Sequence, residues 1–431
     1  MSLNESLQHP DNRPAEIDTA AFKLDDYDLE RVRGEMARLP AVDEDKMALD
    51  RLARVQAELQ TRELGGLLLY DPVNVRYATG CRNMQIWAMR NSSRYCLVPA
   101  EGQTVIFDFI HCEHMSEHLP TVAESRPAKM WLNHIAGARR DEVMKAWAEE
   151  LADAIKERCP NNRIAVDRLD GDPRAALETH QIQVSFGQGV IEQARRIKTP
   201  EELKAQMRSA HVCQTALRLM RDATRPGVTE NEIWAILVGV NVALEGDYTE
   251  SRMVVSGPRT NPWYTEASNR RIQAGELLGI DTDMIGPYGY STDMSRTWLC
   301  KPGTPTATQK ELYSAAYDQV MTNKALLKAG LSFRELAEKS WRIPSKFEHY
   351  ECGCIVHGIG MCNEWPQLVP RRIFDDYGYD GHFEENMTIC VESYIGERGG
   401  HEGVKLEEMV RITRDGCELV GVFPFEDELL S

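Results

Sequence analysis

The stretch from residue 277 to residue 298, LLGIDTDMIGPYGYSTDMSRTW, constrains the fold of this chain more than any other. An apolar run precedes the residues GPYG and a second strand-like run follows them, which predicts a β-hairpin. Side chains two apart on a strand share a face, so Asp281 and Asp283 would point together, and Asp293 would return beside them. Three carboxylates this close destabilise a fold unless a cation neutralises them. The hairpin therefore predicts either a divalent metal site or solvated acids at a hairpin mouth.

Three further candidate ligands lie downstream. The apolar run 387–395 carries a single acid, Glu392, and the run 404–413 carries Glu407. His357 lies in the string CIVHGIG, where a histidine beside apolar residues is usually part of a core. The order Asp, Asp, His, Glu, Glu instead favours a ligand set. Oxygen and nitrogen donors without thiolate suit two hard or borderline cations bridged by carboxylates.

Composition narrows the class of protein. The 431 residues are enough for two domains that each bury a core. No apolar stretch reaches the roughly 18 residues needed to span a bilayer, and the N-terminus lacks a signal pattern, so we expect a cytoplasmic protein. Eleven cysteines without a short secreted framework indicate reduced thiols. The net charge of −17 opposes binding to nucleic acid or an anionic membrane, which leaves a small molecule as the expected partner.

The front of the chain predicts an arm and an α/β domain. Residues 1–43 are polar and then helix-like, which suits an arm lying on another surface. Residues 44–188 alternate expected helices and strands and so favour a three-layer fold. The expected helices are 46–61 and 141–158, and the expected strands are 64–70, 94–98, 104–107 and 163–166. Asp71-Pro72 indicates a turn. His111, His114 and His118 have helical spacing, but solvated surface histidines are the better interpretation than a metal site.

Residues 189–431 predict a second, α+β domain, with the boundary between 186 and 198. Thr199 and Glu202 form the capping-box pattern that starts a helix, and Thr229 with Glu232 repeats it. Ser332 shows the same pattern. The expected helices are 199–221, 230–245, 307–328 and 333–341.

The ligand order, together with the strings STDMSRT at 291–297 and HGIG at 357–360, resembles the pita-bread superfamily of methionine aminopeptidase, prolidase and creatinase. The resemblance covers residues 190 to 425, and the front of the chain is similar to a creatinase-like N-terminal domain. It implies an α+β protein, with a creatinase-like α/β N-terminal domain followed by a pita-bread catalytic domain. It also implies metal ligands, which are Asp281, Asp293, His357, Glu392 and Glu407.

Two departures separate this chain from the peptidases of that superfamily. Those peptidases generally carry two more histidines, at positions that hold Tyr264 and Glu364 here. Their absence removes the usual proton donor and oxyanion helper for amide cleavage. Asp283 also stands where hydrolases usually carry a small residue. An extra carboxylate favours a harder or higher-valent metal such as iron.

With these departures, the sequence resembles the peptidase-like dimethylsulfoniopropionate lyases. The resemblance is carried by the strings NMQIW (83–87), SGPRTNPW (256–263), DTD (281–283) and NEWP (363–366). The resemblance implies six ligands including Asp283, a homodimer, and elimination of dimethyl sulfide from a small zwitterion to leave acrylate. It also implies two divalent metal ions, iron first, with zinc, manganese or cobalt as alternatives. Aromatic faces suit a sulfonium cation, and an arginine suits the substrate carboxylate. The candidate substrate-binding residues are Trp87, Trp263, Trp365, Arg259 and Arg90.

Two positions differ from the lyase pattern. Asn363 stands at the site of the acidic catalytic residue, and Cys352 stands at a tyrosine position. An amide cannot abstract a proton, so the base would be another group, such as a metal-bound hydroxide or Glu364, or the substrate would differ. Asn363, Glu364 and Tyr264 are thus the catalytic candidates. The alternatives are a metal-dependent C–N hydrolase of the Xaa-Pro dipeptidase, creatinase or ectoine hydrolase kind, and a binding protein that kept the fold.

Overall fold

A six-stranded sheet organises the N-terminal domain of the computed structural model, which describes residues 28–430. The strand order is β4-β3-β2-β1-β5-β6. The strands are β1 Gly66–Leu69, β2 Tyr95–Pro99, β3 Thr104–Asp108, β4 Val122–Pro127, β5 Arg163–Val166 and β6 Gln183–Phe186. The helices are α3 Glu44–Thr61, α4 Pro72–Thr79, α5 Gln85–Arg90, α6 Asn133–Ala136, α7 Arg140–Arg158, α8 Gly171–Glu178 and α9 Gln188–Arg195.

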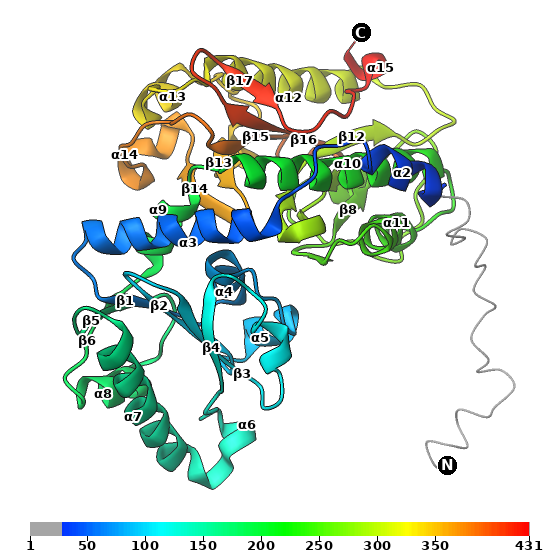
Figure 1. Ribbon diagram of the computed structural model, residues 1–431. Coiled ribbons are helices and arrows are strands. Elements are labelled where there is room, and N and C mark those ends of the chain that lie inside the picture. The colour runs from blue at the N-terminus through cyan, green and yellow to red at the C-terminus, as the bar shows by residue number, and fades with distance from the viewer. Residues whose placement is uncertain (1–27, 431) are drawn as a thin grey trace, which may run out of the picture.

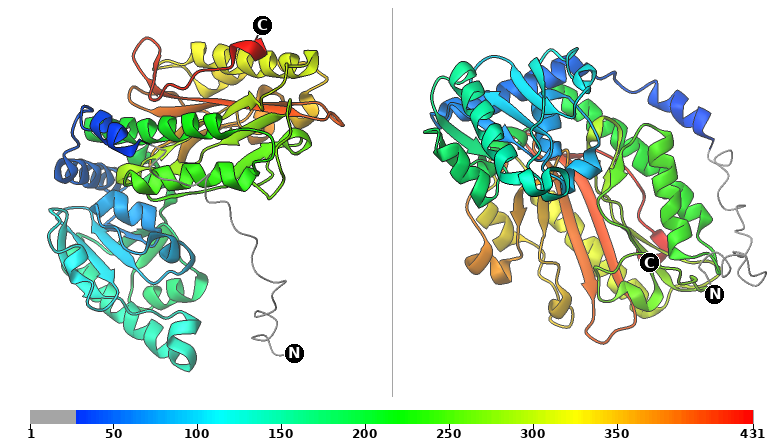
Figure 2. Two further views of the ribbon diagram at one scale, coloured as in Figure 1. Left: turned by 90° about the vertical axis from the view of Figure 1, so that its right-hand side faces the viewer. Right: turned by 90° about the horizontal axis from the view of Figure 1, so that it is seen from below.

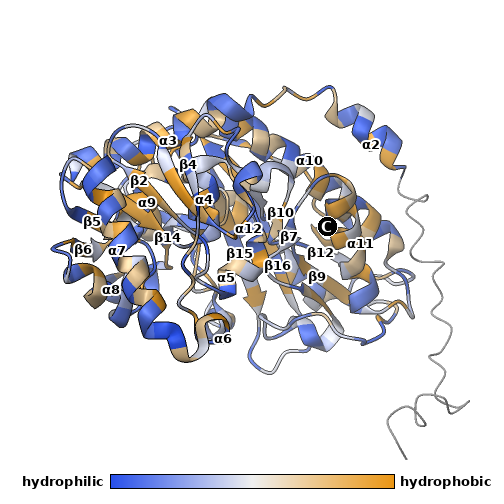
Figure 3. Ribbon diagram, turned by 60° about the horizontal axis from the view of Figure 1, so that its bottom comes forward, coloured by the Kyte–Doolittle hydropathy of each residue, from blue (hydrophilic) through white to orange (hydrophobic). Residues whose placement is uncertain are grey.

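Helices cover both faces of this sheet, so the predicted three-layer fold is confirmed (Figure 1). Leu67 of β1 packs in one cluster with Leu59 of α3, and its neighbour Leu68 packs in the other with Leu151 of α7. A strand buried on both faces is apolar without alternation, which is why residues 64–70 read as one buried run. Figure 3 shows the same concentration of apolar residues along β2.

Two local predictions in this domain are wrong. Asp71-Pro72 is the start of α4, because the Asp71 side chain caps the helix by accepting from the Val73 N–H. The segment with His111, His114 and His118 forms only the short 3₁₀ turn Glu113–Met115, and His111 has a φ of 67°. The three histidines do not share a helical face, but they are exposed, which confirms their interpretation as surface histidines.

The C-terminal domain has strands between two helical layers (Figure 2). Its helices are α10 Pro200–Ala223, α11 Glu230–Ala243, α12 Ala307–Leu326, α13 Phe333–Lys339, α14 Phe374–Tyr377 and α15 Asp427–Leu430. Its strands are β7 Tyr248–Thr249, β8 Met253–Ser256, β9 Leu277–Asp281, β10 Met284–Ile285, β11 Ser291–Thr292, β12 Arg296–Leu299, β13 Val356–Ile359, β14 Asn363–Leu368, β15 Thr388–Gly396, β16 Gly403–Ile412 and β17 Cys417–Leu419.

Three sheets make up this strand layer, with the orders β12-β9-β8, β11-β10-β7 and β14-β13-β15-β16-β17. Leu312 of α12 packs with Val391 and Leu406 of the five-stranded sheet, while Leu237 of α11 packs with Leu278 of β9. Strand β16 contacts β9 and β12, so the sheets meet where the predicted ligands lie.

The predicted helix starts agree with the structure. Both halves of the capping box are present at Thr199 and at Thr229, whereas Ser332 only accepts from the Glu335 N–H. The helix predicted from residue 307 begins at Ala307, and a capping box at Thr306, which was not predicted, marks this start as well. Each cap pairs helix N–H groups that otherwise lack a partner.

The arm is described from residue 28 onward, and residues 1–27 lie outside the described part of the chain. Helix α2, Leu29–Met36, lies against α10, where Val32 packs in the same cluster as Val212. The Arg208 guanidinium donates to the carbonyls of Leu39 and Pro40 at 3.0 Å each. Within residues 28–43 the predicted arm therefore lies on the C-terminal domain.

Candidate metal centre

The six predicted ligands come from separate strands and loops that the fold brings to one place. The predicted hairpin is confirmed, with β9 paired to β12 and β10 paired to β11. Asp281 ends β9 and Asp293 precedes β12, but Asp283 has a φ of 36° and interrupts the strand. The prediction that Asp281 and Asp283 share one continuous strand face is therefore wrong. On the facing sheet, Glu392 of β15 lies directly opposite Glu407 of β16.

Five of these side chains form a buried cluster, in which each is at most 8% exposed. His357 Nε2 lies 3.2 Å from Glu392 Oε1, 3.5 Å from Glu407 Oε1 and 3.9 Å from Asp293 Oδ2. Carboxylate oxygens of Asp281, Asp293 and Glu407 lie within 4.8 Å of one another. The structure thus brings together donors that sequence alone places up to 126 residues apart, between Asp281 and Glu407 (407 minus 281).

The electrostatics of the cluster call for a cation. Burial and the neighbouring carboxylates raise the pKa of Asp293 well above its usual value, and burial with Asp281 raises the pKa of Asp283 to about 6. Within residues 28–430, Glu407 Oε1 is buried and has no hydrogen-bond partner. Crowded carboxylates with an unpartnered oxygen are the donor set that hard or borderline divalent ions require. The residues therefore fit the two metal ions that the ligand order predicts.

His357 is oriented by its own strand. Its Nδ1 lies 3.0 Å from the carbonyl oxygen of Gly358, which can only accept, so Nδ1 carries a proton and Nε2 faces the carboxylates. Burial opposes a charge on the ring, but the nearby carboxylates of Glu392 and Glu407 outweigh it and raise the pKa of His357 to about 10. A metal ion at Nε2 would take the place of that second proton.

Sequence reasoning gave no role to Lys405 or Ser295, which lie inside the cluster. The Lys405 ammonium donates to Glu392 Oε2, lies 2.8 Å from Ser295 Oγ, and lies 3.3 Å from oxygens of Asp281 and Glu407. Ser295 Oγ is 2.8 Å from both Asp281 Oδ1 and Glu407 Oε2. Lys405 is two residues from Glu407 on β16, so the period of two could have placed it on the ligand face.

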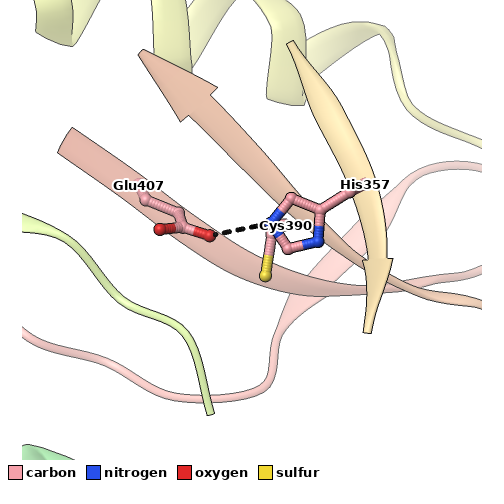
Figure 4. Close-up of side chains that lie close together, drawn as sticks. All are labelled: His357, Cys390 and Glu407. Carbon is pink, nitrogen blue, oxygen red and sulfur yellow. Dashed lines mark ion pairs between the residues drawn. The ribbon is translucent and has the colours of Figure 1, made fainter. Parts of the chain in front are cut away.

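Cys390 is a second residue that the sequence analysis missed. It lies opposite His357 in the β13/β15 pair and two residues before Glu392, so it shares their face of the sheet. Its sulfur and donor atoms of His357 and Glu407 lie within 4.8 Å of one another. Figure 4 shows the three side chains gathered in one place. The fully buried thiol lies 3.8 Å from the Asp293 carbonyl oxygen. The eleven cysteines are all free, as the composition predicts.

Glu250 is a third. It is exposed at the end of β7, and its backbone N–H donates to the carbonyl of Asp283 at 2.9 Å. Although the residue as a whole is exposed, partial desolvation of its carboxyl group, together with the charges of Asp283 and Asp71, raises the pKa of Glu250 to about 7. A carboxyl group that titrates near neutrality therefore lies beside the loop that carries Asp283.

Glu364, a predicted base, is held in a buried ion-pair network. Its Oε2 lies 2.6 Å from Lys198 Nζ, its Oε1 lies 3.5 Å from Arg195 Nε, and it accepts from the Met361 N–H at 3.1 Å. A Cβ on Gly360 would lie 2.3 Å from the Glu364 carboxyl oxygen, so only glycine fits there. Both side chains of the Glu364–Lys198 pair are 1% exposed. These contacts leave Glu364 no access to a substrate and make it a structural residue.

Asn363 points the other way on the same strand. It pairs with Ile359, which packs with Cys390 and Met409, so Asn363 lies on the ligand face at the edge of the sheet. Its side chain is exposed. Of the two neighbouring catalytic candidates, only Asn363 is exposed, and its role in the reaction stays a prediction.

An aromatic cavity of about 220 Å³ adjoins the cluster. Its lining residues are Pro262, Trp263, Tyr264, His349, Tyr350, Glu351, Cys352 and Tyr394. Tyr394 lies two residues after Glu392 and directly opposite Lys405, so it shares the ligand face of the sheet. Tyr264 is 77% exposed with a φ of 70°, and its hydroxyl and the Cys352 thiol interact. Burial raises the pKa of that thiol to about 12.

The other predicted substrate residues lie elsewhere. Arg259 Nε is bound to the buried Glu230 carboxylate at 3.1 Å and 3.2 Å, so its guanidinium is already paired. The Trp365 ring packs 5.2 Å from that of Phe333, on the core beneath α12 and α13. Trp87 and Arg90 lie on α5 of the N-terminal domain. These residues do not line the aromatic cavity.

Comparison with known proteins identifies the family. The model for metallopeptidase family M24 matches residues 204–414, and that for the creatinase/prolidase N-terminal domain matches residues 51–209. Dimethylsulfoniopropionate lyase DddP of Roseobacter denitrificans is 36% identical over 401 residues, which are 92% of this chain and 90% of that protein. The chain belongs to metallopeptidase family M24. The DddP lyase of Roseovarius nubinhibens is 35% identical, with the same coverage of both chains.

This M24 enzyme also has the fold of solved peptidases. An Xaa-Pro dipeptidase from Bacillus anthracis superposes with a TM-score of 0.70 at 20% identity, covering 88% of this chain and 99% of that one. At that identity the likeness shows the fold alone, a creatinase-like domain followed by a pita-bread domain, and both predictions of fold are confirmed. Between residues 28 and 430, no helix is both long enough and apolar enough to cross a bilayer.

Replacing Glu364 tests its structural role. Glu364→Gln leaves Lys198 buried without its counter-charge, so we expect the free energy of unfolding to fall by about 3 kcal/mol. Metal content should not change, because the pair lies outside the cluster. Urea unfolding and elemental analysis measure the two quantities. Unchanged stability together with a loss of turnover would show that Glu364 takes part in catalysis and is not a structural residue.

Replacing Asp293 tests the ligand set. Asp293 is buried between Asp281 and Glu407, so Asp293→Ala should lose most of the bound metal, as measured by elemental analysis of dialysed protein. Asp167→Ala is the matched control, because Asp167 is a buried carboxylate of the N-terminal domain that accepts backbone N–H groups at 2.8 Å and 3.0 Å. Wild-type metal content in Asp293→Ala would contradict the assignment.

Proposed function

We propose that this enzyme is a metal-dependent carbon–sulfur lyase. Its substrate would be dimethylsulfoniopropionate or a related small zwitterion, cleaved by elimination to dimethyl sulfide and acrylate. The observation that carries the proposal is the aromatic cavity beside the ligand cluster. The identity of 36% and 35% to two dimethylsulfoniopropionate lyases over 92% of the chain supports it.

The cavity suits an onium cation. Trp263, Tyr264, Tyr350 and Tyr394 line it, and the rings of Trp263 and Tyr394 lie 5.9 Å apart. Aromatic faces attract a desolvated cation by about 2 kcal/mol or more in favourable cases. Tyr394 is held in place by its hydroxyl, which donates to the Thr260 carbonyl at 2.9 Å. A sulfonium group in this cavity would lie beside Tyr394, which is two residues from Glu392 on the same face of β15.

The reaction assigns different tasks to different groups. A base takes a proton from the carbon next to the carboxylate, the carbon–sulfur bond breaks, and its electron pair leaves with neutral dimethyl sulfide. Bound at the ligand cluster, the two metal ions would act as Lewis acids that polarise the substrate carboxylate. The aromatic residues hold the leaving group and exclude water. Trp263 Nε1 is buried without a hydrogen-bond partner in residues 28–430, so it is free to donate to a ligand.

Amide hydrolysis has weaker support. The two positions that carry histidine in the peptidases hold Tyr264 and Glu364, and Glu364 is bound to Lys198 and Arg195. The histidines that serve amide cleavage in the peptidases are thus missing at both places. The expected homodimer stays a prediction.

The deciding experiment is a headspace assay. Protein loaded with Fe²⁺, and in parallel with Zn²⁺, Mn²⁺ or Co²⁺, is incubated with dimethylsulfoniopropionate, and dimethyl sulfide is measured by gas chromatography. The same samples are tested on a panel of Xaa-Pro dipeptides. Dimethyl sulfide release supports the proposal, and its absence with every metal would overturn it. Dipeptide cleavage would move the assignment to hydrolysis.

Restoring an acid at position 363 should raise lyase turnover. Asn363→Asp places a carboxylate at the edge of the ligand face, where it can take a proton that the amide cannot. General-base catalysis contributes typically about 10²–10⁴-fold, so a large rise in kcat is expected. Asn363→Ala is the control for side-chain size. Equal rates for all three proteins would show that residue 363 does not take part in proton transfer.

Removing one ring of the cavity should weaken substrate binding. Tyr350→Leu removes a π face but keeps apolar volume, so KM should rise by about tenfold with little change in kcat. Tyr350→Phe keeps the ring and should behave like wild type. Tyr379→Leu serves as a control outside the cavity, since Tyr379 stacks on Trp365. Equal KM values for the leucine and phenylalanine variants of Tyr350 would argue against cation recognition there.

A further inference from the structure

A buried lysine lies among the proposed ligands. Lys405 is 3% exposed, and its ammonium contacts the carboxylates of Asp281, Glu392 and Glu407, which come from three different strands. It also lies 2.8 Å from Ser295 Oγ, which itself lies 2.8 Å from Asp281 Oδ1 and Glu407 Oε2. Lys405 and Ser295 together thus connect the carboxylates of Asp281, Glu392 and Glu407.

The contacts of Lys405 exclude a role in binding the substrate carboxylate. An ammonium group has three N–H donors, and four acceptor oxygens already surround this one. The Lys405 backbone is fixed as well, because its N–H and carbonyl both bond the Thr297 hydroxyl, at 3.2 Å and 2.9 Å. Lys405 therefore acts on the metal-binding side chains and not on a substrate bound in the aromatic cavity.

Charge gives the reason for a lysine at this place. The ligand set holds five carboxylates, which are Asp281, Asp283, Asp293, Glu392 and Glu407. Two divalent ions leave one of these negative charges uncompensated, and the Lys405 ammonium supplies the missing positive charge. An uncompensated buried charge is strongly destabilising, so a cation that belongs to the chain stabilises the cluster.

We propose that Lys405 is a built-in counter-ion that keeps the ligand carboxylates assembled in the absence of metal ions and lowers the metal affinity of the site. This rests on the metal centre of the proposed function. Before metal binds, loss of Lys405 leaves carboxylates that repel one another across short distances. After metal binds, the metal ions supply most of the countercharge, and the ammonium repels them. Loss of Lys405 therefore destabilises the unloaded protein more than the loaded one, which by linkage tightens metal binding.

The test compares Lys405→Met with Lys405→Arg. Chelator-stripped Lys405→Met should melt at a lower temperature than stripped wild type. Addition of Co²⁺ or Zn²⁺ should raise the melting temperature of this variant by more than it raises that of wild type. The Kd of the variant for that ion, measured by competition with a chromophoric chelator, should be about tenfold lower than the Kd of wild type. Lys405→Arg keeps the charge and should restore both quantities toward wild type.

Lys198→Met is the matched control. Lys198 is the other lysine that is buried among residues 28–430, and its one carboxylate partner, Glu364, lies outside the ligand set. It should lower the melting temperature of stripped and loaded protein equally and leave Kd unchanged. A Lys405→Met protein that is soluble only when metal is present supports the proposal.

Two results would overturn it. Weaker or unchanged metal binding in Lys405→Met, with wild type binding metal, would show that Lys405 does not oppose the ions. Wild type that binds no metal would remove the metal centre itself, and the proposal with it. The first result leaves the proposed function standing and the second does not, so the two failures are distinguishable.

Discussion

Repulsion among buried carboxylates is the constraint on which the rest of this structure depends. Asp281, Asp293, Glu392 and Glu407 are each at most 8% exposed, and such a group is unstable without opposite charge and fixed geometry. The fold supplies both. Glu407 is fixed through its backbone, because its N–H bonds the Ser295 carbonyl and its own carbonyl accepts from Arg296. These bonds join the two sheets at the cluster, so the ligand geometry and the packing of the domain depend on one another.

Sequence predicted the features that local chemistry determines. The capping boxes at Thr199 and Thr229 are local patterns, and the strands around Glu392 and Glu407 follow from strand-like runs in the sequence. The ligand order then carried the family resemblance. Features set by backbone strain were out of reach: a φ of 36° at Asp283 cannot be read from a run that looks like continuous strand.

Long-range pairing explains the other errors. Glu364 looked like a base because it lies seven residues after His357, yet its partners Lys198 and Arg195 come from the segment that joins the two domains. Arg259 looked free for a substrate, yet Glu230 of α11 binds it. In both cases a charged residue was assigned to the site because its counter-charge is distant in sequence. A buried ion pair and a catalytic group have the same sequence signal, and only the fold separates them.

The fold does not choose the reaction, since a dipeptidase shares it at a TM-score of 0.70 and 20% identity. The choice lies in the residues around the metal cluster. A Glu364 bound in ion pairs removes support for amide cleavage, and four aromatic rings beside Glu392 add a place for an onium group. If Asp283 binds metal as predicted, it brings a fifth carboxylate to the ligand set, and the Lys405 ammonium, which contacts three of the other four, would supply the balancing charge. A site that keeps its charge balanced in this way can hold an extra oxygen donor without giving up the stability of the buried cluster.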